Sequence, residues 1–172
     1  MAVDVFKNFI FAYLECRDKE KTLSFLGTSI FSIGTGENES AINRQGVELL
    51  IHDEILASPS PIIITYHSID AAQVSETVVV VQTAGTIKFY ELDGEDVTME
   101  IRHSATLVFD GEQFKIVALH CSTPTAIQEE EEFLPIRFAQ KTIKELENQN
   151  KHTLLSLLDT CLLYTSHIHA ER

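Results

Sequence analysis

The sequence predicts an α+β fold in which helices come first and an antiparallel sheet follows. Apolar residues recur every three or four positions as far as residue 58, which is typical of helices. From residue 62 to residue 122 they alternate or form β-branched runs, which is typical of strands. The pairs Asp93-Gly94 and Asp110-Gly111 predict turns between long strands. Because helices and strands are segregated along the chain, this order argues against a parallel βαβ sheet.

Three helices are expected in the N-terminal part. The apolar face of the first helix is the series Val3, Phe6, Ile10 and Tyr13 or Leu14. The second is short, with Asp18 as its N-cap and Gly27 as its expected end. The third begins near Asn43 and ends before Pro59, and its apolar face is the series Val47, Leu50, Ile51 and Ile55.

A short strand over 29–33 and a glycine-rich loop lie between the second and third helices. The loop segment Gly34-x-Gly36 lacks the third glycine and the lysine of nucleotide-binding loops. Acidic residues follow it, and they would repel a phosphate. We therefore expect a tight turn here and no nucleotide site.

Four long strands are expected over 62–74, 77–90, 97–109 and 114–122, with a bulge or bend at Gly85. The favoured loop at Asp110-Gly111 pairs odd positions of 97–109 with even positions of 114–122. One face then carries Ile101, His103, Ala105, Leu107 and Phe109 beside Phe114, Ile116, Ala118, His120 and Ser122. A bulge would exchange the first set for Arg102, Ser104, Thr106 and Val108.

The composition places limits on partners and compartment. Thirteen Lys and Arg against 26 Asp and Glu give a net charge of −13, which disfavours nucleic acid and anionic membrane surfaces as partners. No apolar run is long enough to cross a bilayer, and the N-terminus does not resemble a secretory signal. The three cysteines have no paired spacing. We expect a cytoplasmic protein with no cofactor and no metal.

The segment HCSTPTAIQEEEEF, 120–133, combines several reactive residue types. His120 and Cys121 are neighbours in a strand, so their side chains point to opposite faces and cannot act together. His120 and Ser122 share a face but are too far apart for direct proton transfer. His103 and His120 could hold a metal with a Glu, although two hydrogen-bonded pocket histidines are the favoured interpretation. We assign no catalytic residue.

The segments AYLECRDKEKTLSFL, IGTGENE, IRHSATLVFDGEQFKIVALHCSTP and QEEEEFLP resemble SnoaL-like domains of the nuclear transport factor 2-like superfamily. The resemblance covers residues 5–140, and it is strongest to domains attached to bacterial signalling proteins. It implies a cone-shaped sheet wrapped around the N-terminal helices, with a pocket at the open end, and a homodimer. Members usually carry Trp at the position of Phe114, and Gly within the stretch where this chain has only Glu.

The resemblance suggests a non-catalytic sensory module over residues 1–134 that binds a small molecule. The expected ligand-binding residues are Tyr13, Arg102, His103, Phe114, His120 and Ser122. The superfamily also contains isomerases, polyketide cyclases, dehydratases and epoxide hydrolases, so a small enzyme is the alternative. Those enzymes use a pocket Asp. The Asp residues here, Asp70 among them, are expected in or next to turns or strand ends.

Residues 135–160 are expected to form a helical linker. A heptad seam recurs in steps of three and four, with Asn150 at a position that fixes register in two-stranded coiled coils. The seam residues are Ile136, Ala139, Ile143, Leu146, Asn150, Thr153 and Leu157. The alternatives are a dimeric coiled coil that leads to a missing C-terminal output domain and a helix packed on its own domain. Residues 161–172 begin with CLLYTS, which one reading frame of a common sequencing adaptor encodes. We expect them to be a non-native tail.

Overall fold

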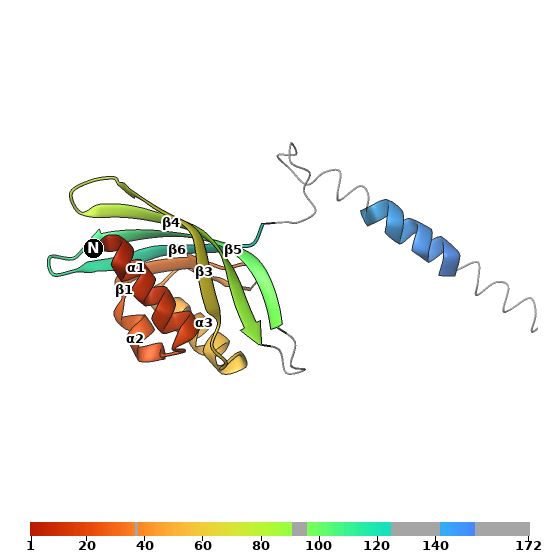
Figure 1. Ribbon diagram of the computed structural model, residues 1–172, viewed down its shortest axis with the longest axis horizontal. Helices are drawn as coiled ribbons and strands as arrows, with labels where there is room; N and C mark the ends of the chain where they lie inside the picture. Colours follow the sequence, from red (N-terminus) through yellow and green to blue (C-terminus); the bar gives the residue numbers. More distant parts are fainter. Residues whose placement is uncertain (37, 91–95, 125–141, 154–172) are drawn as a thin grey trace, which may run out of the picture. The chain divides into compact units, whose positions relative to one another are not determined.

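The computed structural model describes residues 1–36, 38–90, 96–124 and 142–153 (Figure 1). The predicted order of elements is confirmed. The helical elements of the first part are α1 (Ala2–Ile10), a π-helical turn (Phe11–Glu15), α2 (Lys19–Ser24) and α3 (Arg44–Ala57). The strands are β1 (Leu26–Ile33), β2 (Ser40–Ala41), β3 (Ile63–Gln73), β4 (Val78–Tyr90), β5 (Asp96–Phe109) and β6 (Phe114–Ser122).

The strands form one six-stranded sheet in the order β2-β1-β6-β5-β4-β3. The meander from β3 to β6 is antiparallel, as predicted. The first strand differs from the prediction, because β1 runs parallel to β6 and begins at Leu26. Gly27 therefore lies inside a strand and does not end α2. A Cβ at Gly27 would lie 2.9 Å from Val117, so close packing of β1 on β6 accounts for the glycine.

Helix α1 crosses one face of the sheet, which we call the helix face (Figure 1). Phe6 and Phe9 of α1 are fully buried in one core cluster with Val81, Leu107 and Ile116 of the sheet. Burial alternates along β4 and β5, so that odd-numbered residues there face this core. The even-numbered residues of β4 and β5 lie on the other side of the sheet, which we call the opposite face.

The helix boundaries follow the predicted caps. The Asp18 carboxylate accepts a hydrogen bond from the Lys21 N–H at 2.9 Å, and the Asn43 side chain accepts one from the Gly46 N–H at 2.9 Å. The loop at Gly34 and Gly36 is a tight turn closed on Glu39. The Glu39 carboxylate accepts a hydrogen bond from the Gly36 N–H at 2.9 Å. The turn therefore holds a carboxylate at the place where a phosphate would have to bind.

The predicted register of β5 and β6 is right near the turn and wrong beyond it. Leu107 pairs with Ile116 as expected, but Thr106 pairs with Ala118, so β6 has an extra residue at Val117. Each residue of β6 after this bulge is moved to the other face. His103 therefore pairs with Cys121, while His120 pairs with Ser104. The expected common face for His103, His120 and Ser122 does not form.

The predicted irregularity at Gly85 is present, and the extra residue belongs to β3. Tyr66 pairs with Gly85 and Ser68 pairs with Ala84, which leaves His67 unpaired as a bulge. A Cβ at Gly85 would lie 2.5 Å from the Thr65 carbonyl oxygen. Glycine is needed here because the two backbones approach too closely for a side chain.

A separate helix spans residues 142–153. Its seam residues Ile143 and Leu146 are 57% and 53% exposed. The rest of the predicted linker, the Glu run, the Asp93-Gly94 turn and the tail over 161–172 lie outside the described residues. None of the described helices is long and apolar enough to cross a membrane.

Candidate functional site: a polar pocket on the opposite face of the sheet

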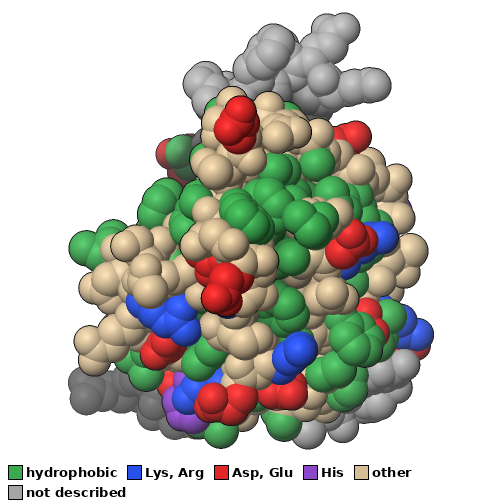
Figure 2. All heavy atoms as spheres, turned by 90° about the vertical axis from the view of Figure 1, so that its left-hand side faces the viewer, with side chains coloured by type: hydrophobic (Ala, Val, Ile, Leu, Met, Phe, Trp, Pro, Cys, Tyr) green, Lys and Arg blue, Asp and Glu red, His purple; other side chains and the backbone are tan. Residues whose placement is uncertain are grey.

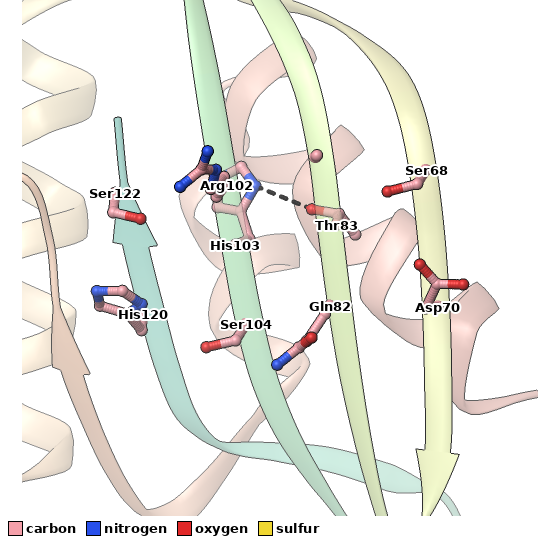
Figure 3. A pocket seen from close by; sticks show the side chains of 10 residues that line it. Ser68, Asp70, Gln82, Thr83, Arg102, His103, Ser104, His120 and Ser122 are labelled. Atoms are coloured by element: carbon pink, nitrogen blue, oxygen red, sulfur yellow. Dashed lines mark hydrogen bonds between the residues drawn. The ribbon is translucent and has the colours of Figure 1, made fainter. Parts of the chain in front are cut away.

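A pocket of about 350 Å³ lies on the sheet, and most of its lining comes from the opposite face (Figure 3). Its lining residues are Ser68, Asp70, Gln82, Thr83, Ala84, Arg102, His103, Ser104, His120 and Ser122. Four neighbouring strands, β3 to β6, contribute to it. Thr83 and His103 border it through the strands, while their side chains are buried toward the helix face.

The pairing of the strands explains why a depression forms. The lining forms two rows across β6, β5, β4 and β3: Ser122, Arg102, Ala84 and Ser68 in one row, and His120, Ser104, Gln82 and Asp70 in the other. Because side chains on one face of a sheet stand roughly perpendicular to it, the short residues in each row leave a hollow beside the long ones.

The pocket carries opposite charges on the two sides of β4. Arg102 and His120 stand on β5 and β6, and Asp70 stands on β3 (Figure 3). Asp70 lies inside β3 and pairs with Gln82 of β4, so the expectation that it lies at a strand end is wrong. Glu100 and Arg102 are two residues apart on β5, yet they form no ion pair among the described residues. Glu100 instead accepts from the Thr86 hydroxyl at 2.8 Å and lies 3.6 Å from His67 Nδ1.

On the helix face, His103 is a buried neutral histidine. Its ring lies edge-on to Phe6 with the centroids 6.1 Å apart, and its Nδ1 is 3.4 Å from the Thr83 hydroxyl. Burial, with a smaller contribution from His120, lowers the pKa of His103 to about 4. A histidine with this pKa is neutral near pH 7, so it cannot act there as an imidazolium acid.

Tyr13 and Cys121 also lie on the helix side. Tyr13 donates its phenolic hydrogen to the Glu54 carboxylate. Burial and then Glu54 raise the pKa of Tyr13 well above its usual value. Burial, followed by Glu39 and Glu54, raises the pKa of Cys121 to about 12, which suppresses the thiolate that a nucleophile requires.

The predicted site residues are therefore divided between three places. Arg102, His103, His120 and Ser122 surround the pocket, whereas Tyr13 lies at the helices. Phe114 lies beside Phe109 at the hairpin end of the sheet, with the ring centroids 5.5 Å apart. Sequence reasoning missed Gln82, Ser104 and Asp70, which the parity of β3 and β4 with β5 could have placed on one face. It also missed Glu54, for which no local pattern gave a signal.

The described residues include no group of three His, Cys, Asp or Glu side chains placed to hold a metal. His103 and His120 lie on opposite faces, which separates the two expected ligands. On the face of the molecule in Figure 2, acidic and basic side chains are scattered among hydrophobic ones. That face shows no continuous basic surface among its described residues.

The profile of the SnoaL-like domain family matches residues 3–126. The chain belongs to the SnoaL-like domain family. No curated protein matches this SnoaL-like domain in sequence.

Solved structures show the same fold as this SnoaL-like domain. A protein from Streptomyces avermitilis assigned as a dehydratase of the NTF2-like family has a TM-score of 0.64 and 14% identity, over 71% of this chain and 93% of that chain. A Xanthomonas campestris protein assigned as a calcium/calmodulin-dependent protein kinase II association domain has a TM-score of 0.62 and 14% identity, over 73% and 87%. The association domain of that kinase from C. elegans has a TM-score of 0.57 and 16% identity, over 70% and 92%. Identities this low relate the folds alone.

Proposed function

We propose that this SnoaL-like domain is a non-catalytic module that binds a small molecule in the pocket on the opposite face. The observation that carries the proposal is the cluster of Arg102, His120, Gln82 and Ser104 around an open pocket on a rigid sheet. Pockets of about 300–1,000 Å³ with a few convergent polar groups are typical of small-molecule sites. The pocket replaces the cone interior as the expected binding site.

The titratable groups of the helix face support a role without chemistry. His103 has a pKa of about 4, and Cys121 has a pKa of about 12. The pKa of Tyr13 is raised as well. An acid or base that acts near neutral pH needs a pKa near that pH. The pKa values of these three groups are shifted away from neutral pH.

We further propose that the module works as an oligomer and belongs to a signalling protein. Two structural neighbours are association domains of a protein kinase, or are assigned as such. The helix over 142–153 exposes Ile143 and Leu146 at the seam positions predicted for a coiled coil. A paired helix of this kind would relay occupancy of the pocket to an output domain that follows.

A screen of small metabolites by thermal unfolding of the full chain tests the binding role. Compounds that bind the folded state raise the unfolding temperature, and the rise grows with the ratio of their concentration to their Kd. The rise in unfolding temperature should be lost in Arg102→Gln. It should be kept in the control Lys7→Gln, which removes an exposed charge on α1. Compounds that act equally on both variants, or a screen without stabilising compounds, would contradict the proposal.

A small isomerase, cyclase, dehydratase or hydrolase is the second candidate. The hydrogen bond from Tyr13 to Glu54 favours it, since a phenol and a carboxylate in contact can share a proton. Turnover of a ketone or enol substrate that is abolished in Glu54→Gln and unchanged in Arg102→Gln would support this candidate against the binding module.

A further inference from the structure

We infer that the pocket on the opposite face binds a small zwitterion, with its carboxylate at Arg102 and its ammonium group at Asp70. The inference rests on the proposed binding function and names the class of ligand. Its basis is the arrangement of one cationic and one acidic side chain on the two sides of β4, in a pocket that also holds Gln82 and three serines.

The strand pairing fixes the separation of the two charges. Asp70, Gln82, Ser104 and His120 form one row across β3, β4, β5 and β6. Arg102 belongs to the next row, with Ala84 and Ser122 as its partners. Neighbouring strands are about 4.8 Å apart, so the backbones of Asp70 and Arg102 are separated by about 10 Å across the strands. The Arg102 side chain is long, so the distance between its guanidinium and the Asp70 carboxylate can match the length of a small organic molecule.

The charged groups are available for a ligand. Among the described residues, the side chains of Arg102 and Asp70 form no hydrogen bond or ion pair, either with each other or with a third group. Both are exposed. The sheet prevents them from approaching each other, because each is fixed to a strand on either side of β4. A molecule with a carboxylate and an ammonium group could pair with both.

The neutral groups around the charges suit the same ligand. Gln82 offers both donors and acceptors, and Ser68, Ser104 and Ser122 offer hydroxyls that can do either. Such groups can accept hydrogen bonds from an ammonium group or donate them to a carboxylate. His120 stands beside Ser104 and can donate to the same carboxylate that Arg102 binds.

The charge of the whole chain favours a zwitterion over a simple anion. A net charge of −13 repels a free anion at long range. Asp70 would repel that anion again within the pocket, and Arg102 would repel a simple cation. A zwitterion carries no net charge, so it avoids the long-range repulsion and meets an opposite charge at each end. The arrangement therefore discriminates against both kinds of simple ion.

Three matched probes test the inference by calorimetric titration of the full chain: 4-aminobutyrate, butyrate and butylamine. We expect 4-aminobutyrate to bind about tenfold more tightly than either of the others, as expected for one added charged hydrogen bond. In Asp70→Asn the preference over butyrate should disappear, and in Arg102→Gln the preference over butylamine should disappear. Asp53→Asn on α3 and Lys7→Gln on α1 make the same charge changes outside the pocket and should keep both preferences.

The outcomes separate this inference from the binding function. Equal affinity for butyrate and 4-aminobutyrate, with loss of both in Arg102→Gln, would overturn the zwitterion and leave an anion-binding module. Preferences that survive in Asp70→Asn would overturn the assigned contact with the ammonium group. Binding of no probe would overturn the inference, whereas the wider metabolite screen decides the binding function by itself.

Discussion

Arg17 joins the end of the π-helical turn to the end of α3 through Glu54. Its guanidinium donates to the Glu54 carboxylate at 3.2 Å and to the Glu54 backbone carbonyl at 3.1 Å. It also donates to the carbonyl oxygens of Tyr13 and Ser58. Only 5% of the Arg17 side chain is exposed, so these acceptors share a partner that water cannot easily replace. A cation at the end of α3 also opposes the negative end of its helix dipole.

Arg17→Ala should lower the free energy of unfolding by about 2 kcal/mol, because it removes a buried guanidinium and leaves backbone carbonyl groups without their partner. The ion pair itself adds little, since the Glu54 side chain is 45% exposed. Arg17→Lys should lose part of this amount, since a lysine keeps the charge but cannot reach several acceptors at once. Urea unfolding at equilibrium measures both values. A loss below about 0.5 kcal/mol in Arg17→Ala, which is typical of surface positions, would show that the contact is not structural.

His103 should make the protein less stable as the pH falls. The unfolded chain binds a proton at this residue below about pH 6.5. The folded chain does so only below its lowered pKa of about 4. The unfolded state therefore binds more protons than the folded state between these two pH values. As a result, the free energy of unfolding should fall by about 2 kcal/mol between pH 7 and 4.5 because of His103.

Urea unfolding at the two pH values, in the natural chain and in His103→Gln, isolates this contribution. The variant should depend less on pH, because glutamine does not titrate. His52→Gln on α3 is the control and should keep the full dependence. The same pH dependence in His103→Gln and in the natural chain would contradict the buried neutral state.

Gly85→Ala should destabilise the fold by about 2 kcal/mol, as expected for overpacking at a close contact. The new Cβ would lie 2.5 Å from the Thr65 carbonyl oxygen, which the β3–β4 pairing holds in place. Gly36→Ala is a matched control, because its Cβ would meet the flexible Glu39 carboxylate at 3.0 Å. Thermal unfolding should shift clearly for the first variant and little for the second. Equal shifts would show that the β3 bulge can adjust.

Leu146→Lys should weaken self-association of the full chain, because it places a charge in the predicted helical seam. Gln149→Lys adds the same charge outside the seam of that helix and should leave association unchanged. Sedimentation equilibrium over a range of concentrations measures the dimer dissociation constant. If both variants associate like the natural chain, the seam has no part in assembly.

The sequence predicted the fold well because its signals are local. Asp18 and Asn43 mark their helix starts through caps that depend on a few neighbouring residues. The meander followed from alternation and from turn residues. The parallel pairing of β1 with β6 could not be predicted in this way, because it depends on contacts between residues far apart, such as Ser32 and Leu119.

The site was predicted less well, and Val117 is the reason. Odd and even positions of a strand lie on opposite faces only while the strand pairing is regular. One extra residue at Val117 breaks this alternation and moves His120 and Ser122 to the opposite face. Arg102, His120 and Ser122 thus share the opposite face, while the side chain of His103 stays on the helix face. Bulges carry no fixed residue type apart from glycine, so alternation alone could not locate this one.

Chemical-shift mapping of 4-aminobutyrate on the labelled full chain locates the bound ligand residue by residue. The largest amide shifts should fall on Gln82, Ser104 and His120, and all three should saturate with the same Kd. The natural chain should show smaller shifts at Tyr13 and Glu54, which lie with the helices. Shifts that are largest at Tyr13, Glu54 and Cys121 would contradict the account and move the binding site to the helix face.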